Sequence, residues 1–390
     1  MRMSLSSRRE YLSNVVQRYK KAQTKKERSR ILDEVVCVLG YNRKYAIQVL
    51  NKPVRERKGK GKRHKPLKYL ESLPVIQRVW EALDYPCAER LHPVLLPMAE
   101  LLAKHGELCL TPVVRQQLAQ ISRATLARRL AKWRSLKPKY TIPRKKAGEA
   151  LSSDVPIDRY AWDEDRPGAL EVDLVEHNGG SSLGHFAYTL TVVDVVSGYS
   201  RRRAILGRSQ LAVFQELKAI IAEWPFKPWG LHTDNGSEFL SRHLLRFCQE
   251  NGLAFTRSRP YRKNDNAHVE EKNRHYVREI VGYERYDTPQ DVAWLNEVYA
   301  YLDVYANLFL PMRKVIAKSR NGAHVHKTYD KAKTPFQRLL EAGVLDTDTQ
   351  TRFQRQLEAI NPLDLHRKLE ALLARTPSSA PASLLAEQAL

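Results

Sequence analysis

The chain has 390 residues, of which 43% are apolar and 28% are charged; this apolar content is enough for ordinary buried cores and excludes a wholly disordered chain. Lys and Arg outnumber Asp and Glu by 66 to 43, which gives a net charge of +23. The excess lies in residues 1–150, which hold 35 basic and 12 acidic residues, whereas residues 151–390 hold 31 of each. A front section this basic is typical of a protein that binds a polyanion, and a merely solvated basic surface is the alternative.

Cysteine usage and the lack of long apolar stretches bear on the compartment. The four cysteines are scattered without a CxxC pair, which predicts free thiols in a reducing compartment and no structural zinc (Cys37, Cys87, Cys109 and Cys248). Residues 1–23 have no apolar signal-peptide core, and the longest apolar stretch, 91–103, is interrupted by Pro93 and Pro97. We therefore expect a cytoplasmic protein that does not contact a membrane.

Residues 1–51 are predicted to form a helix-turn-helix DNA-binding unit. Thr24 and Glu27 have the spacing of a capping box that begins a helix, and Gly40 ends that helix. A second helix follows after a short turn, which is the helix-turn-helix pattern. In that arrangement Arg43 and Lys44, near the start of the second helix, would face DNA.

Residues 52–72 are predicted to be a basic linker or arm. Nine of the seventeen residues from 52 to 68 are basic, and a run this dense repels itself. One interpretation is an arm that follows DNA phosphates or the minor groove, and the other is a solubilising linker. The residues that would contact DNA under the first interpretation are Lys58, Lys60, Lys62 and Arg63.

A second helical block is predicted at residues 73–135, and its last part again has the helix-turn-helix pattern. Ser122 is a candidate N-cap for the final helix, which carries apolar residues on one face. The opposite face carries the candidate DNA contacts Arg123, Arg128 and Arg129. Residues 136–164, which are rich in proline and basic residues, are predicted to be a basic linker.

From residue 165 the apolar pattern changes from helical spacing to alternation. Strands are predicted at 169–176, 186–194, 199–206, 229–233 and 254–257, with helices at about 209–223 and 237–251 and from residue 264 or 265 past 280. This order predicts an α/β domain over residues 165–310. Residues 311–375 are predicted to be a basic and mostly helical C-terminal region, with helices at 335–342, 349–359 and 363–374, and residues 376–390 a disordered tail.

Three carboxylates in the α/β domain are candidates for one site. Asp173 lies inside an apolar strand, Asp234 follows a strand at its carboxyl end, and Glu270 lies on a helix thirty-five residues beyond Asp234. Taken singly, these acids could be an edge-strand charge, a turn residue and an ordinary acidic first turn. If they converge, their repulsion requires a divalent cation, and oxygen ligands select Mg²⁺ or Mn²⁺. Two such ions per site serve in-line displacement at phosphorus.

The sequence around these acids resembles the integrase core of DDE transposases, the bacterial insertion-sequence transposases that are related to retroviral integrases. The resemblance rests on the segments at 171–174 (EVDL), 232–239 (HTDNGSEF) and 259–270 (RPYRKNDNAHVE). It implies a ribonuclease-H-like fold and Mg²⁺-dependent DNA cutting and joining by a homodimer or higher oligomer. The implied partners are double-stranded DNA, both the terminal repeats of a transposon and the target, and the implied location is the bacterial nucleoid. Asp173, Asp234 and Glu270 match the catalytic triad, with Glu271 as the rival for the third acid.

The chemistry assigns roles to these residues. Asp173 would bridge both metal ions, while Asp234 and Glu270 would each hold one. Arg274 and Arg278, one and two turns beyond Glu270, would point toward DNA phosphate, and Lys263 would flank the site. His268 could act on a proton or contact DNA. The zinc-binding domain of retroviral integrases is absent, and the two helix-turn-helix units would replace it.

The sequence thus predicts a multidomain protein with an α-helical helix-turn-helix front section, an α/β ribonuclease-H-like catalytic core and a mostly helical C-terminal region. The predicted activity is metal-dependent 3′-end cleavage and strand transfer. Two alternatives stay open: a nuclease of the same fold that cuts without joining, and a non-catalytic DNA-binding regulator.

Overall fold

The computed structural model describes residues 5–51, 69–134, 166–258, 266–321 and 324–375. The chain divides into two compact units, Met1–Leu67 and Lys68–Leu390. The predicted basic arm with Lys58, Lys60, Lys62 and Arg63, the linker at 136–164, Lys263 and the tail at 376–390 lie outside the described residues. Among the described helices, none has the length and apolar character needed to cross a membrane.

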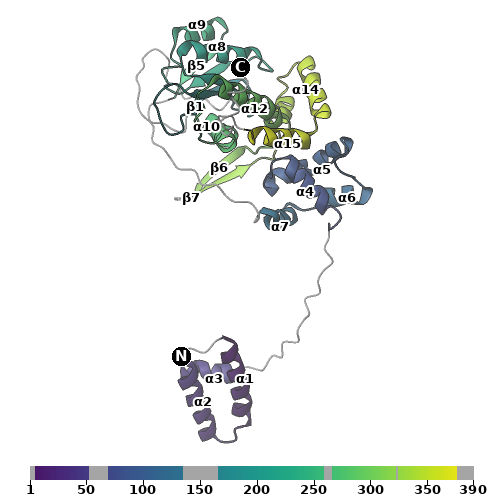
Figure 1. Ribbon diagram of the computed structural model, residues 1–390. Helices are drawn as coiled ribbons and strands as arrows, with labels where there is room; N and C mark the ends of the chain where they lie inside the picture. The colour runs from purple at the N-terminus through teal and green to yellow at the C-terminus, as the bar shows by residue number, and fades with distance from the viewer. Residues whose placement is uncertain (1–4, 52–68, 135–165, 259–265, 322–323, 376–390) are drawn as a thin grey trace, which may run out of the picture. The chain divides into compact units, whose positions relative to one another are not determined.

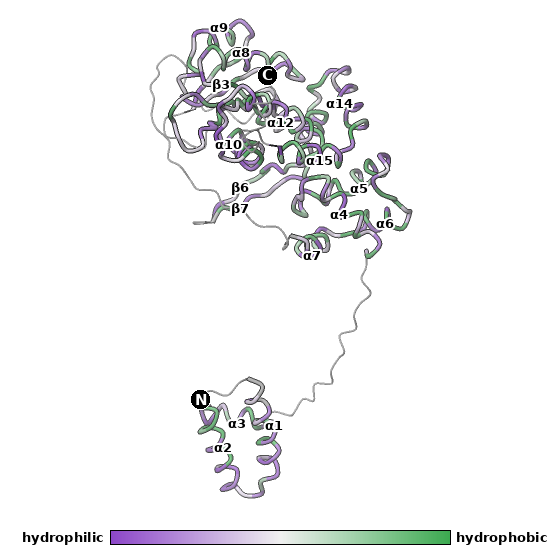
Figure 2. Tube along the Cα trace, viewed as in Figure 1, coloured by the Kyte–Doolittle hydropathy of each residue, from purple (hydrophilic) through white to green (hydrophobic). Residues whose placement is uncertain are grey.

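The first unit contains three helices, α1 (Leu5–Lys21), α2 (Lys25–Leu39) and α3 (Arg43–Asn51) (Figure 1). The capping box predicted at the start of α2 is present: Thr24 Oγ1 accepts a hydrogen bond from Glu27 N at 3.2 Å, and Glu27 Oε2 accepts one from Thr24 N at 3.3 Å. Gly40 ends α2 in the left-handed conformation, with a φ of 68°. Hydrophilic and hydrophobic residues alternate along all three helices, because each helix buries one side in a small common core (Figure 2).

The second unit begins with the helical block α4 (Leu73–Ala82), α5 (Ala88–Lys104), α6 (Pro112–Gln120) and α7 (Arg123–Arg134). Its helices share buried apolar side chains, and the rings of Trp80 and Trp133 lie 5.8 Å apart. Thr111 caps α6 by accepting a hydrogen bond from Val114 N at 3.2 Å, and Ser122 accepts one from Thr125 N at 3.2 Å. The cap predicted at Ser122 is therefore present.

A five-stranded mixed sheet forms the centre of the second unit. Its strands are β1 (Ala169–Glu176), β2 (Ala187–Asp194), β3 (Ser200–Leu206), β4 (Gly230–Thr233) and β5 (Ala254–Arg257), in the order β3-β2-β1-β4-β5. β1 pairs antiparallel with β2 and parallel with β4, so β1 is where the two pairing modes meet. The sheet and its helices are consistent with the predicted ribonuclease-H-like core with helical flanks.

The helices of this core are α8 (Gln210–Ala222), α9 (Arg242–Glu250), α10 (Ala267–Asn273), α11 (Glu279–Val281) and α12 (Pro289–Leu308), with a π-helical turn, η1 (Arg274–Arg278), between α10 and α11. The sequence predicted a start for α9 at residue 237, but the helix begins five residues later, after Ser241, whose hydroxyl accepts a hydrogen bond from Leu244 N at 3.1 Å. The single helix predicted beyond residue 265 is instead divided by η1.

The C-terminal region contains a β-hairpin as well as helices. The hairpin strands are β6 (Val315–Asn321) and β7 (His324–Tyr329), and the helices are α13 (Pro335–Ala342), α14 (Thr347–Ala359) and α15 (Pro362–Leu373). The sequence analysis predicted only a basic stretch at these strands, although Val315, Ile316, Val325 and Tyr329 are strand-favouring residues on either side of a short turn.

The helical block and the C-terminal helices are packed against the core. Tyr305 of α12 donates a hydrogen bond to the Ala82 carbonyl at 2.9 Å, and Trp294 of α12 donates one to the Leu372 carbonyl at 3.2 Å. Asn361, the N-cap of α15, donates to Glu107 Oε1 at 2.7 Å. The block at 73–134 is therefore joined to segments more than 150 residues away rather than forming a separate body.

Candidate active site

Asp173 lies in the middle of β1, the strand at the centre of the sheet. Because side chains alternate along a strand, Asp173 and Glu171 share one face, and the intervening Val172 is buried on the other. Asp173 Oδ2 accepts a hydrogen bond from Asn273 Nδ2 at 2.7 Å. A residue of β1 is thereby joined to the last residue of α10, one hundred positions later in the chain.

Asp234 directly follows β4, the parallel neighbour of β1. Thr233 is in register with Val172, which brings Asp234 to the part of the sheet where Asp173 lies. Asp234 Oδ1 accepts a hydrogen bond from Gly236 N at 2.9 Å. A Cβ at position 236 would lie 2.9 Å from that same oxygen and 2.7 Å from Glu238 Oε1, so any larger residue would displace these two carboxylates.

The loop after Asp234 is fixed by its own polar contacts. Asn235 Nδ2 donates to the Ser258 carbonyl at 2.9 Å, and Arg257 Nη1 donates to Asn235 Oδ1 at 2.7 Å. Asp234 therefore makes the turn contact that the simpler interpretation predicted and also lies at the edge of the site. Burial raises the pKa of Asp234, and the positive charge of Arg208, a residue that the sequence did not single out, partly offsets this rise; its guanidinium lies 4.0 Å from Glu238 Oε1.

Glu270 lies in the first turn of α10, and the N-terminal end of this helix is held by Glu171. Glu171 Oε2 accepts a hydrogen bond from Val269 N at 2.7 Å and is also bonded by the backbone of His268. Glu171 is fully buried, so this contact is shielded from water. The sequence analysis missed the role of Glu171; its only signal was an acid two positions from Asp173 on the same face of an apolar strand.

The electrostatics place all three predicted acids near one another. The pKa of Asp173 is raised to about 7, first by burial and then by the charge of Asp234, with a smaller contribution from Glu270; the hydrogen bond from Asn273 opposes this shift. Burial, outweighing the backbone bonds to Val269 and His268, raises the pKa of Glu171 to about 8, and the charges of Glu270 and Asp173 add to the rise. Burial also raises the pKa of Asp234. The site therefore holds like charges whose repulsion a cation would relieve.

The three acids do not surround a single point in this conformation. Within the part of the chain that the structure describes, no group of three or more His, Cys, Asp or Glu side chains is arranged to hold a metal ion. The acids that flank Asp173 come from different elements, β4 and α10. Asp173 could share ions with its two neighbours only after the carboxylates move from these positions.

Glu270 and Glu271, the two candidates for the third acid, lie in different surroundings. The charge of Glu270 contributes to the pKa of Asp173, whereas Glu271 lines a separate cavity of about 510 Å³ together with Lys272 and Tyr276. Burial lowers the pKa of Lys272 to about 7, and its ammonium lies 3.7 Å from Met312 Sδ. Of the two acids, Glu270 is therefore the one whose charge is felt at Asp173.

The predicted basic contacts lie on or near the surface, with different surroundings. Arg274 is exposed, and its Nε lies 3.4 Å from Glu279 Oε1, whereas Arg278 is half-buried 4.7 Å above the ring of Tyr283. Asn273, three residues after Glu270 at the end of α10, contacts Asp173, as the regular i, i+3 spacing of a helix allows. The remaining candidates are exposed or, for Arg129, half-buried: Arg43, Lys44, Arg123, Arg128 and Arg129.

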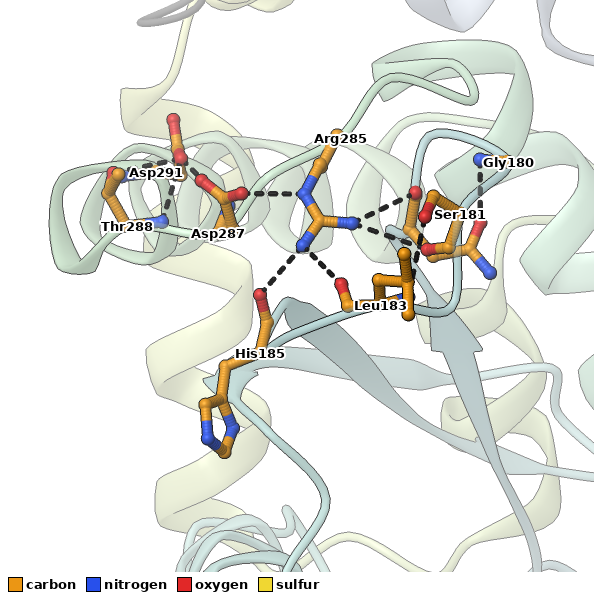
Figure 3. Close-up of polar contacts among 9 residues, drawn as sticks. Gly180, Ser181, Leu183, His185, Arg285, Asp287, Thr288 and Asp291 are labelled. Carbon is orange, nitrogen blue, oxygen red and sulfur yellow. Dashed lines mark hydrogen bonds and ion pairs between the residues drawn. The ribbon is translucent and has the colours of Figure 1, made fainter.

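The loop that leaves β1 is held in place by Arg285 (Figure 3). Its Nη2 donates to the carbonyls of Leu183 and His185 at 2.8 and 3.1 Å, and its Nη1 donates to those of Asn178 and Ser181 at 3.3 and 3.2 Å. Asp287 Oδ2 accepts from Arg285 Nε at 2.6 Å. One guanidinium thus satisfies four loop carbonyls and fixes the end of the strand that carries Asp173.

Comparison with known proteins identifies the central domain. Residues 164–263 match the integrase core domain family, a range that contains Asp173 and Asp234 and ends before Glu270. The solved catalytic core domain of BIV integrase matches with 19% sequence identity, 45% of this chain and 95% of that chain covered, and a TM-score of 0.29. The uncharacterized protein y4rM of Sinorhizobium fredii is 34% identical over 338 residues, which cover 86% of this chain and 96% of the relative. The chain therefore belongs to the same family as y4rM and carries an integrase core domain, which implies the polynucleotidyl transferase superfamily.

Proposed function

We propose that this chain is a DDE transposase of a bacterial insertion sequence, which binds transposon ends, cleaves their 3′ ends and joins them to target DNA. The observation that carries the proposal is the environment of Asp173: a carboxylate on the central strand, with its pKa raised to about 7 by burial and by Asp234 and Glu270. These acids lie on the elements that the motif predicts, in and beside an integrase core domain. Acids whose pKa values are strongly perturbed by burial and by one another are typical of a catalytic site.

The donor set fits divalent cations with hard oxygen preference. Asp173, Asp234 and Glu270 offer only carboxylate oxygens, and the repulsion among them is the kind that Mg²⁺ or Mn²⁺ removes. We assign Asp173, Asp234 and Glu270 as the residues that would hold two such ions. When bound, two such ions supply activation of the attacking oxygen and charge neutralisation at the leaving oxygen.

The residues around the acids would keep them in position for this chemistry. The Asn273 amide holds one oxygen of Asp173 and so restricts the orientation of this carboxylate. The contacts of Asn235 fix the loop that carries Asp234, and Glu171 fixes the start of α10 beside Glu270. Rigid support of this kind lowers the cost of organising charged ligands around a phosphodiester.

The proposed reaction consists of two in-line displacements at phosphorus. In the first, a water oxygen forms a bond to the phosphorus at a transposon end while the bond to the 3′ oxygen breaks, which leaves a 3′-hydroxyl. In the second, that hydroxyl attacks a phosphodiester of the target, so one P–O bond forms as another breaks. The bond count is conserved in the second step, so neither ATP nor a covalent enzyme intermediate is required.

DNA binding is assigned to the basic helices outside the core. Arg43 and Lys44 are exposed at the start of α3, and Arg123 and Arg128 are exposed on α7. Exposed basic side chains on helices are suited to contacts with phosphates and the edges of bases. Because a transposase acts on two transposon ends together, we expect a homodimer or a higher oligomer on DNA.

The test is strand transfer with oligonucleotides copied from the DNA ends that flank the gene. Wild type, Asp234→Asn and the matched control Asp348→Asn, an exposed acid on α14, are compared with and without Mg²⁺. Joined products that require Mg²⁺ and Asp234, but not Asp348, would support a transposase. Metal-dependent cutting without joining would indicate a nuclease instead, and end binding without chemistry in any protein would contradict the catalytic assignment.

A further inference from the structure

The β6–β7 hairpin is a two-stranded sheet whose described side chains are exposed on both faces. Every side chain that is described from Ile316 to Tyr329 is exposed, with exposed fractions of 65% for Ile316, 53% for Val325 and 41% for Tyr329. A two-stranded hairpin with no buried face is at best marginally stable in water. Surfaces of this kind are explained by a partner that covers them.

The hairpin carries charge of one sign. Residues 313–329 contain five Lys or Arg and no Asp or Glu. Register pairs Arg320 with Val325 and Lys318 with Lys327, so on one face a basic position lies across from an aliphatic one and two basic positions lie across from each other. A second copy of the chain placed on this face would bring like charges together, whereas a polyanion would complement them.

The base of the hairpin is firmly attached to the catalytic domain. The Lys314 ammonium donates to the carbonyls of Val195 and Val196, at the end of β2. Lys314 N donates to Asp330 Oδ1 at 2.7 Å, and Arg338 Nη1 lies 2.7 Å from Asp330 Oδ2. Met312, just before the hairpin, contacts Lys272 of α10 through the 3.7 Å sulfur contact, and the hairpin extends below α10 in Figure 1. A ligand held by the strands would therefore have a fixed relation to the helix that carries Glu270.

We propose that the β6–β7 hairpin is a DNA-binding ribbon, which contacts the phosphates of double-stranded DNA with Arg320 and Lys327 while its aliphatic side chains lie in the groove. A two-stranded ribbon has the width that the major groove admits. This inference rests on the proposed function, because it takes DNA as the substrate, and it adds a contact surface that is separate from the basic helices.

The test compares two double variants of the full-length protein that remove the same charge. Arg320→Ala with Lys327→Ala alters the hairpin, and Lys218→Ala with Arg355→Ala removes two exposed basic side chains on α8 and α14. Affinity for a random-sequence duplex is measured by fluorescence anisotropy at salt concentrations from about 0.05 to about 0.3 M, because the salt dependence of the affinity reports the number of phosphate contacts. Melting curves check that all variants are folded.

We expect the hairpin variant to bind about tenfold or more weakly near physiological salt and to reduce the slope of log affinity against log salt by about 2. The control variant should lose about twofold or less, because separated surface charges are screened. Equal losses in the two variants would overturn the inference, as would a hairpin variant with unchanged affinity. If Ile316→Ser with Val325→Ser instead lowers the mass in sedimentation without changing DNA affinity, the hairpin is a contact between copies.

The binding assay separates this inference from the proposed function. It is performed in Ca²⁺, so no cutting or joining is needed for the readout. If wild type binds no DNA, the proposed function fails as well. If wild type binds and joins DNA while the hairpin variant binds equally well, only the hairpin inference fails.

Discussion

The Glu171 carboxylate accepts a hydrogen bond from the Val269 backbone N–H at 2.7 Å, although the two residues are 98 positions apart in the chain. Glu171 lies in β1 and Val269 in the first turn of α10, next to Glu270. The first backbone N–H groups of a helix have no partner within the helix, and the Glu171 oxygen supplies one. The strand that carries Asp173 thus fixes the start of the helix that carries Glu270.

Replacement of Glu171 should show whether this residue positions the acids of the site or only stabilises the fold. Glu171→Ala removes the acceptor for Val269 N, and we expect strand transfer to slow by roughly tenfold or more, as for other misplaced catalytic groups. The Mg²⁺ concentration for half-maximal activity should also rise. Glu171→Gln keeps an oxygen acceptor and should retain most of the activity.

A buried acid elsewhere provides the control for Glu171. Asp194 accepts hydrogen bonds from Gly168 N and Ser197 N, both at 2.6 Å, so Asp194→Ala should reduce stability without changing the Mg²⁺ requirement. If Glu171→Ala and Asp194→Ala lose activity only in proportion to their loss of melting temperature, the positioning role is wrong.

Divalent ions should stabilise the second unit through the acid site. Because Asp173 and Asp234 repel one another when ionised, a cation that binds only the folded protein stabilises it, by about 2.7 kcal/mol at a hundredfold excess over Kd. The melting temperature with and without Mg²⁺ measures this effect. Asp234→Asn should show a smaller Mg²⁺ shift, and without metal it should lower the pKa of Asp173. Equal Mg²⁺ shifts in the two proteins would be evidence against the site.

His177 should make stability depend on pH. Burial lowers its pKa from the ordinary value of 6.5 to about 3, and its Nε2 lies 2.7 Å from Thr189 Oγ1. Below pH 6.5 the unfolded chain takes up a proton that the folded protein excludes, so the stability contributed by neutral His177 is complete above 6.5 and is lost as pH falls toward 3.

Urea unfolding at about pH 7.5 and pH 5 measures the His177 effect. When the pH is lowered from about 7.5 to about 5, the free energy of unfolding should fall by about 2 kcal/mol more in wild type than in His177→Gln. His326→Gln, on the exposed strand β7, should behave like wild type. A His177→Gln variant with the same pH dependence as wild type would contradict the prediction.

Removing one partner of the ion pair between Arg202 and Asp303 should strongly destabilise the protein. Their side chains are 0% and 1% exposed, and Arg202 N also donates to Asp303 Oδ2 at 3.0 Å. The guanidinium lies 4.8 Å above the ring of Tyr276, so the pair connects β3, α12 and η1. Asp303→Ala leaves a buried charge without its partner, and we expect a loss of about 3–5 kcal/mol in chemical unfolding.

Two comparisons make the Arg202 prediction specific. Arg202→Met combined with Asp303→Leu removes both charges and should recover much of the loss. Asp364→Ala breaks the exposed pair with Lys368, whose atoms lie 2.8 Å apart, and should cost about 1 kcal/mol or less. A double variant as unstable as Asp303→Ala would show that packing, rather than unpaired charge, dominates.

Local patterns were sufficient for the elements of the core and for two of its acids. Alternation around Asp173 predicted β1 over its observed range, 169–176, and the Thr-Asp-Asn-Gly turn placed Asp234 at the end of β4. The capping box at Thr24 and Glu27 was also predicted, because its partners are three residues apart. Contacts between residues only a few positions apart can be predicted, because they depend on the spacing of residues along the chain.

The sequence therefore determined which residue types could form an acid site and on which elements they lie: Asp173, Asp234 and Glu270. Only the tertiary structure decided what supports them. Asn273 contacts Asp173, Glu171 caps α10, and the basic stretch after residue 313 forms a hairpin whose described side chains from Ile316 to Tyr329 are exposed. The physical reason is that the first two contacts join residues about a hundred positions apart and the hairpin depends on faces left unburied, and no local spacing of side chains specifies either.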